Sequence, residues 1–263
     1  MAPIQSLHDP SGQHHQLRIW PANTAGPAPL LLCLDGDWLH DDLELFCATT
    51  TKRPVHLASL GYGLEHAQTA ARRAFDYTPL GPQGQRHDPR VEHWRCGGAD
   101  AFTDFLQDDV LPRLRSRLNV AGPVALYGHS YAGLYCLYAL LRRPALFDYY
   151  YAASPALWWY WPMMLNQAQS FSLQQPAFLL TMAGENEQWH AQPAIPGQPR
   201  RGGSLTLPLV TAFMDTISTQ PLLHADLQQF SELGHGPMLQ RSALHALHHF
   251  IQRSQSQHNS LSS

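Results

Sequence analysis

The segment "PVALYGHSYAGLYCLYALLRR" (residues 123–143) constrains the fold more than any other part of the chain. An apolar run leads to a glycine, a serine follows at position 130, and helix-forming residues then continue to the proline at position 144. This order predicts a buried strand that turns sharply into a helix at the serine. Such a pair is typical of a parallel sheet, because the chain must cross over the sheet before it can form the next parallel strand.

Apolar runs alternate with amphipathic segments along the rest of the chain as well. This alternation predicts an α/β fold, a mainly parallel sheet with helices on both faces. We expect strands at residues 15–20, 29–35, 54–59, 123–128, 147–154, 177–184 and 227–232. Helical spacing marks residues 101–118, 130–143, 209–218 and 242–253, and Pro112 is expected to bend the first of these helices.

The length of 263 residues is sufficient for one large α/β domain. Two stretches rich in proline, glycine and arginine, residues 80–98 and 190–204, read as long loops. Neither resembles a domain linker, because the same strand and helix pattern continues on both sides. We therefore predict a single domain over residues 1–263, with polar and flexible ends at about residues 1–12 and 254–263.

Charge and targeting features exclude several classes of function. A formal net charge of −3 gives no reason to expect nucleic acid as a partner. The first residues do not have the pattern of a signal peptide and no apolar run is long enough to span a membrane, so we expect a cytoplasmic protein without a membrane partner unless a leader was removed. His245, His248 and His249 share helical spacing but have no carboxylate or cysteine partner, so we assign no metal.

Ser130 is the candidate nucleophile. Residues 128–132, "GHSYA", nearly match the G-x-S-x-G nucleophile elbow, in which the flanking positions must be small because strand and helix approach closely. Gly128 meets that requirement, and Ala132 adds only one methyl group. The alternative is a structural serine at the start of a helix.

His235 is the candidate general base. In an elbow arrangement the base comes after the serine in the chain, on the loop that follows the last strand. His235 lies at that point in "LGHGPML", between two glycines that permit a tight loop. A structural histidine is the alternative.

The acid that orients this histidine should follow the preceding strand, in "AFLLTMAGENEQW". Glu187 lies further past the end of the strand, where the loop can turn its side chain toward His235, so it is the preferred candidate. Glu185, or a carboxylate that is merely solvated, remains an alternative.

Acyl transfer also needs an oxyanion hole, usually two backbone N–H groups. One is expected from Tyr131, the residue after the serine. The other is expected from Asp37 in "LDGD", where Gly36 frees the backbone. An ordinary Asp-Gly turn would have the same sequence.

Six segments, taken together, resemble the "Putative esterase" family of α/β-hydrolases, which includes esterase D and the mycolyltransferases. They occur in the family's order over roughly residues 28 to 250: "LDGD" (34–37), "FDYTP" (75–79), "GGADAF" (97–102), "GHSYAG" (128–133), "YYAASP" (150–155) and "LGHGPM" (233–238). Within the family the chain is most similar to the IroE-like and Fes-like siderophore esterases, the hydrolases of enterobactin and salmochelin. It departs from them at Ala132, where glycine is usual, and in lacking the secretion leader of the periplasmic members.

The resemblance implies an α/β-hydrolase fold, with Ser130 as nucleophile, His235 as base and backbone donors at Asp37 and Tyr131. Relatives differ in the acid, so a Ser–His dyad stays open beside the Glu187 triad. The implied activity is that of a serine carboxylic-ester hydrolase that forms an acyl-enzyme, needs no cofactor and acts on a catecholate siderophore trilactone, free or ferric. The alternatives are a general short-acyl carboxylesterase, an acyltransferase, or a non-catalytic α/β-hydrolase-fold binding protein.

Catecholate siderophores are aromatic and, when loaded with iron, strongly anionic, so their site should offer aromatic faces and arginines. The candidate substrate-binding residues are Arg72, Arg73 and Trp158. Further residues of both types lie in the same two regions: Arg86, Arg90, Arg95, Trp159 and Trp161. The alternative is that the tryptophans pack a lid and the arginines are solvated or pair with Asp76.

Overall fold

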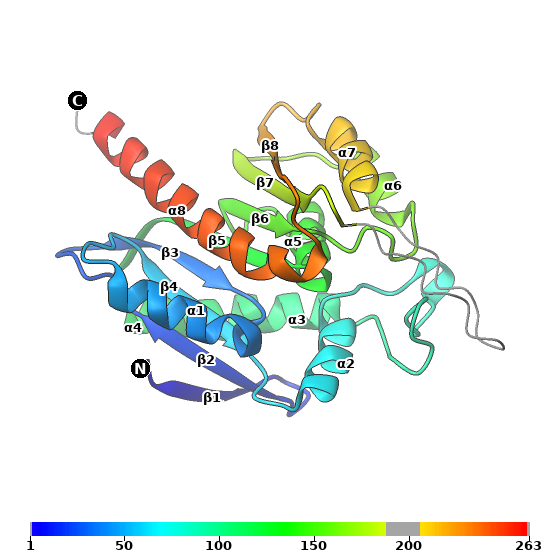
Figure 1. The fold of residues 1–263 in the computed structure, drawn as a ribbon, viewed down its shortest axis with the longest axis horizontal. Helices are drawn as coiled ribbons and strands as arrows, with labels where there is room; N and C mark the ends of the chain where they lie inside the picture. Colours follow the sequence, from blue (N-terminus) through cyan, green and yellow to red (C-terminus); the bar gives the residue numbers. More distant parts are fainter. Residues whose placement is uncertain (1, 188–205, 262–263) are drawn as a thin grey trace.

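The computed structural model describes residues 2–187 and 206–261, and their strands form one eight-stranded sheet in the order β1-β2-β4-β3-β5-β6-β7-β8 (Figure 1). The strands are β1 (Ile4–His8), β2 (His14–Trp20), β3 (Ala28–Cys33), β4 (His56–Gly61), β5 (Val120–His129), β6 (Tyr149–Ala153), β7 (Ala177–Gly184) and β8 (Leu223–Phe230). Strand β2 is antiparallel to β1 and β4, and all other neighbouring strands are parallel. The predicted mainly parallel sheet is confirmed.

Helices cover both faces of this sheet, as predicted (Figure 1). On one face lie α1 (Gly36–Thr49) and α8 (His235–Leu261). The other face carries α2 (His66–Asp76), α3 (Ala99–Phe105), α4 (Leu111–Arg117), α5 (Tyr131–Arg142), α6 (Met163–Gln169) and α7 (Thr206–Ile217). Alternate residues of β3 show the two layers: Leu30 and Leu32 pack on the α5 side, and Leu31 and Cys33 pack on the α8 side.

The parallel strands determine where a site can form. Strands β3 to β8 all end at the same edge of the sheet, because each is parallel to its neighbours. Residues that directly follow these strands are therefore brought together although they are far apart in sequence.

The helix predicted over residues 101–118 consists of three consecutive pieces. Helix α3 continues through a π-helical turn (Leu106–Val110) into α4. Pro112 lies in the first turn of α4, directly after the wider turn, where the missing N–H group of proline costs little.

Both ends of the described chain form secondary structure, and the predicted flexibility of the ends stays a prediction. Residues Ile4–His8 pair with β2 as an edge strand, a short polar segment whose partner lies across a turn. Helix α8 runs to Leu261, because no glycine or proline follows Pro237 to end it.

Candidate active site

Ser130 lies at the turn between β5 and α5 in a strained backbone conformation, with φ 60° and ψ −114°. A Cβ atom on Gly128 would lie 2.4 Å from the carbonyl oxygen of Ala132, so position 128 must be glycine. Ala132 is fully buried, and its methyl group is accommodated at the crossing of strand and helix. The departure from the G-x-S-x-G pattern is therefore compatible with a tight elbow.

The structure brings Ser130, His235 and Glu187 into one hydrogen-bonded chain. His235 Nδ1 lies 2.8 Å from Glu187 Oε2, and His235 Nε2 lies 3.0 Å from Ser130 Oγ. A carboxylate can only accept, so Nδ1 carries the proton and Nε2 of the neutral ring accepts from the serine hydroxyl. This is the tautomer that can take a proton from the serine.

Glu187 is buried and held by two further donors. Its Oε1 atom accepts from the Ser154 hydroxyl at 2.5 Å and from the Gly184 N–H at 2.7 Å. Burial raises the pKa of the Glu187 carboxyl, but the hydrogen bonds from His235, Ser154 and Gly184 outweigh this and hold the pKa below its ordinary value. Glu185, the alternative acid, is exposed.

The base is also fixed through the main chain. His235 is the first residue of α8, a helix of 27 residues that packs along the sheet. The His129 ring donates from Nε2 to the His235 carbonyl oxygen at 3.0 Å. His129, the residue before the nucleophile, thus holds the main chain of His235, the candidate base.

The two predicted oxyanion donors lie in the first turns of two neighbouring helices. Tyr131 is the first residue of α5 and Asp37 is the second residue of α1, and N–H groups in a first turn have no acceptor within their helix. Arg73 bridges the ends of the preceding strands: it donates to both carboxylate oxygens of Asp35 at 2.5 and 2.9 Å and to the His129 carbonyl at 3.1 Å. This bridge holds the two helix starts beside each other.

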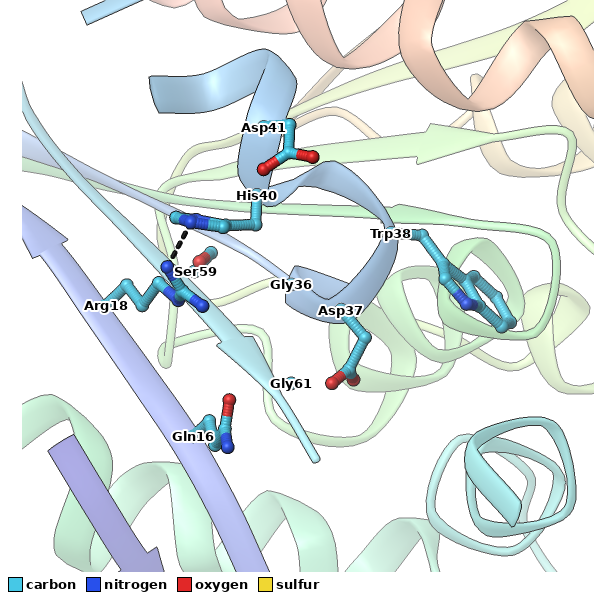
Figure 2. A pocket seen from close by; sticks show the side chains of 9 residues that line it. All are labelled: Gln16, Arg18, Gly36, Asp37, Trp38, His40, Asp41, Ser59 and Gly61. Carbon is cyan, nitrogen blue, oxygen red and sulfur yellow. Dashed lines mark hydrogen bonds between the residues drawn. The ribbon is translucent and has the colours of Figure 1, made fainter. Parts of the chain in front are cut away.

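The Asp37 side chain anchors the start of α1 to the end of β4. Its carboxylate accepts the N–H groups of Tyr62 at 2.7 Å and Gly63 at 2.6 Å. Figure 2 shows this carboxylate lying close to Gly61, while Trp38 points to another side of α1. The Asp37 backbone is thus fixed by its own side chain.

The same view shows a polar cavity of about 160 Å³ between α1 and β2, where Arg18 donates to His40 (Figure 2). It is lined by Gln16, Arg18, Gly36, Asp37, Trp38, His40, Asp41, Ser59 and Gly61. None of the residues around this cavity belongs to the Ser130–His235–Glu187 chain. Asp37, a predicted oxyanion donor, is among the lining residues, so the cavity adjoins the start of α1.

The two arginines expected to bind substrate are engaged elsewhere. Arg73 is buried, with its guanidinium enclosed by Asp35 and lying 4.2 Å from the Trp38 ring centroid. Arg72 pairs with Asp76 at 2.8 Å and with Asp9 at 2.9 Å. The contact with Asp76 is the pairing that the alternative expected for Arg72, and Arg73 pairs with Asp35. A substrate role of either arginine stays a prediction.

Trp158, by contrast, lies against Tyr131, the residue that follows the nucleophile. Its ring packs edge-to-face on Tyr131, with centroids 5.7 Å apart, and the Arg90 guanidinium lies 3.2 Å above it. The neighbouring Trp159 is fully buried and belongs to the core.

Two residues of this region were missed at the level of sequence. Ser154 orients Glu187, and the signal for it was its place directly after β6, at the edge where the other site residues collect. Asp88 accepts the Tyr131 hydroxyl at 2.6 Å, and nothing in its loop distinguishes it from a solvated aspartate.

Among the described side chains, those of residues 2–187 and 206–256, no three histidine, cysteine or acidic groups come together in a way that could hold a metal ion. Over the same residues, no helix is both long and apolar enough to cross a lipid bilayer.

The chain is similar to known proteins in sequence and in fold. Apo-salmochelin esterase from Escherichia coli is 30% identical over 259 residues, 92% of this chain and 76% of that protein. Siderophore triacetylfusarinine C esterase from Aspergillus fumigatus is 36% identical over 163 residues, 56% of this chain and 50% of that relative, so the match spans only half of the fungal protein.

The solved structure of the siderophore hydrolase EstB from Aspergillus nidulans superimposes with a TM-score of 0.74 at 25% identity, and the match covers 95% of this chain and 93% of that one. The predicted α/β-hydrolase fold is confirmed by this likeness. The model of the family described as "Putative esterase" matches residues 12–195. The chain belongs to this esterase family, as its motifs predicted.

Proposed function

We propose that this chain is a serine carboxylic-ester hydrolase that works through an acyl-enzyme. The observation that carries the proposal is the unbroken hydrogen-bonded chain from Ser130 through His235 to Glu187. It lies beside two helix starts whose N–H groups can stabilise an oxyanion.

In the proposed reaction, Ser130 Oγ attacks the ester carbonyl carbon while His235 Nε2 takes the hydroxyl proton. Glu187 keeps the ring in the required tautomer and stabilises the imidazolium. The backbone N–H groups of Asp37 and Tyr131 bind the oxyanion. His235 then returns its proton to the leaving alcohol, and a water, deprotonated in the same way, releases the acid and regenerates Ser130.

The substrate that we propose is a catecholate siderophore trilactone. Support comes from relatives named for siderophore esters, above all the apo-salmochelin esterase, whose match extends over 92% of this chain. The aromatic and cationic pair of Trp158 and Arg90 beside Tyr131 suits a substrate that is aromatic and, with iron, anionic.

The test has two parts. Wild type should turn over p-nitrophenyl butyrate, and an organophosphonate should block turnover and label Ser130, as mass spectrometry of the peptides would show. Ser130→Ala and His235→Ala should each lose about 10⁶-fold in kcat while far-ultraviolet circular dichroism stays unchanged, because the two residues act as one unit.

In the second part, liquid chromatography with mass spectrometry should show a catecholate trilactone converted into its linear trimer and smaller esters. Near-full activity of Ser130→Ala would refute the serine mechanism. Turnover of the simple ester without any cleavage of the trilactone would leave a general carboxylesterase.

A further inference from the structure

The distance between the nucleophile and the base depends on how strand β5 lies against helix α8. Ser130 directly follows β5, and His235 is the first residue of α8. Tyr127 packs in the layer between the sheet and α8, and His129 points to the same face of the sheet, because side chains alternate along a strand. Contacts from these two side chains to α8 can therefore align the two elements.

Both side chains donate to main-chain carbonyl groups of α8. The Tyr127 hydroxyl donates to the Leu239 carbonyl oxygen at 2.9 Å, and His129 Nε2 donates to the His235 carbonyl oxygen at 3.0 Å. Two residues along a strand span about 6.6 Å, and four residues along a helix span about 6 Å. The two bonds therefore match in spacing and fix one register of β5 against α8.

The bond to His235 acts where the local chain gives the base little support. Gly234 and Gly236 flank the base, and glycines leave the main chain free to adopt other conformations. Among the described residues, no atom outside the adjoining turn lies within 4 Å of a Cβ atom built at position 236. Two residues before the base, the Leu233 carbonyl accepts the Asn186 N–H at 3.1 Å. The contact from β5 is thus an anchor on the base residue itself.

The His129 ring is suited to a place beside the base because it stays neutral. It is buried, and its centroid lies 4.7 Å from that of the His235 ring. Burial, followed by the proximity of His235 and Arg73, holds the pKa of His129 well below its ordinary value. A neutral ring does not repel the imidazolium that His235 becomes when it takes the serine proton.

We propose that His129 is a positioning residue that sets the distance between the nucleophile and the base through its bond to the main chain of His235. The proposal rests on the proposed esterase function and adds a residue outside the Ser130–His235–Glu187 chain to the machinery of the reaction. Tyr127 makes the equivalent bond one helical turn further from the base. The two contacts therefore differ in effect: the Tyr127 bond supports the fold, and the His129 bond supports the reaction.

The experiment compares His129→Met with His129→Gln. Both replacements have unbranched side chains of similar length, but only the amide of His129→Gln can donate to the His235 carbonyl. His129→Met should lower kcat on p-nitrophenyl butyrate by up to about 100-fold, the loss that a displacement of about 1 Å can cause. Its KM should stay near that of wild type, because the change moves the base and not the bound ester. His129→Gln should recover most of the lost kcat.

Tyr127→Phe is the matched control, because it removes the other bond from β5 to α8 and keeps the ring. The Ser242 hydroxyl, the second partner of Tyr127, retains its own bond to the Met238 carbonyl at 2.5 Å. This variant should lower the urea midpoint and leave kcat near that of wild type. The rate at which an organophosphonate labels Ser130 should divide the variants in the same way, falling in His129→Met and not in Tyr127→Phe.

An equal fall of kcat in His129→Met and Tyr127→Phe overturns the proposal, because both bonds would then act only by holding the helix in place. A kcat of His129→Met near that of wild type also overturns it, as does a loss in His129→Gln as large as that in His129→Met. Should His129→Met fail to fold, His129→Asn replaces it, since its shorter amide ends near the position of Nδ1 and falls short of the His235 carbonyl. Its kcat should then fall as described for His129→Met, and a kcat near that of wild type contradicts the proposal.

The failure of the proposed function looks different. If wild type cleaves no ester and takes no phosphonate label, the esterase function fails and this proposal falls with it. If wild type is active but the variants do not divide as described, the esterase function stands and only the role of His129 is lost.

Discussion

Asp35 and Glu187 are two buried carboxylates at the same edge of the sheet, one after β3 and the other after β7, yet they have different partners. Asp35 pairs with both nitrogens of the Arg73 fork, and the Arg73 side chain is only 6% exposed. Glu187 pairs with His235, whose side chain is 26% exposed and whose second nitrogen faces Ser130.

The two pairs differ in whether the partner of the carboxylate can exchange a proton. An arginine does not give up its proton in a protein, and Asp35 raises the pKa of Arg73 further, so this pair can only hold elements together. A histidine gains and loses a proton near neutral pH and has a second nitrogen for the nucleophile. A buried carboxylate at an active-site edge is thus identified as the acid of a triad by its partner, and not by its burial.

Among the variants that test this comparison, Glu187→Gln should have the largest effect, a loss of kcat. The amide oxygen can still accept from Ser154 and Gly184, but its NH₂ group faces His235 Nδ1 and favours the wrong tautomer. By analogy with other triads we expect a loss of about 10⁴-fold in kcat, measured on p-nitrophenyl butyrate. Glu185→Gln, an exposed carboxylate two residues away, is the control and should be silent. If both variants are silent, the enzyme works with a Ser–His dyad.

Asp35→Asn should act on stability instead. Removing one partner of a buried pair leaves the Arg73 charge uncompensated, at a cost of about 3–5 kcal/mol in the free energy of unfolding. Urea denaturation measures this cost, with Asp41→Asn, an exposed residue of α1, as the control. A fall in kcat at unchanged stability would make Asp35 part of the chemistry and remove the distinction from Glu187.

The smallest effect is the pH dependence of stability that Glu187 contributes. Its pKa is lower in the folded chain than its ordinary value near 4.5, despite burial, because of its three hydrogen bonds. A group of this kind stabilises the fold above the unfolded pKa and loses that contribution as the pH falls through the folded pKa. The free energy of unfolding of wild type minus that of Glu187→Gln should therefore be constant from pH 7 to about 5 and then decrease. A difference that grows as the pH falls would show that folding raises the pKa of Glu187 instead of lowering it.

The sequence was sufficient to place the hydrogen-bonded side chains of the site, because their positions follow from one local motif and from the order of the strands. The strand, the small residue and the helix around Ser130 are visible in eleven consecutive letters, "ALYGHSYAGLY". His235 and Glu187 then follow from chain order, since successive parallel strands deliver their carboxyl ends to one edge. The geometry now places all three side chains in contact.

The sequence could not show which charged side chains form ion pairs with one another. Arg73 meets Asp35 across 38 residues and Arg72 meets Asp9 across 63 residues, and no local pattern connects them. The arginines nearest the "DYTP" segment therefore looked available for substrate. Asp88 was hidden for the same reason, because its partner Tyr131 is 43 residues away.

The elbow has a consequence for anyone who wishes to engineer this enzyme. The added Cβ at position 128 would meet main-chain atoms of Ala132, which cannot move without unwinding the first turn of α5. Position 132 already accepts a methyl group. The written motif treats positions 128 and 132 alike, but they differ for protein design. Position 132 can be varied among small side chains to adjust the approach of strand and helix, whereas position 128 must stay glycine.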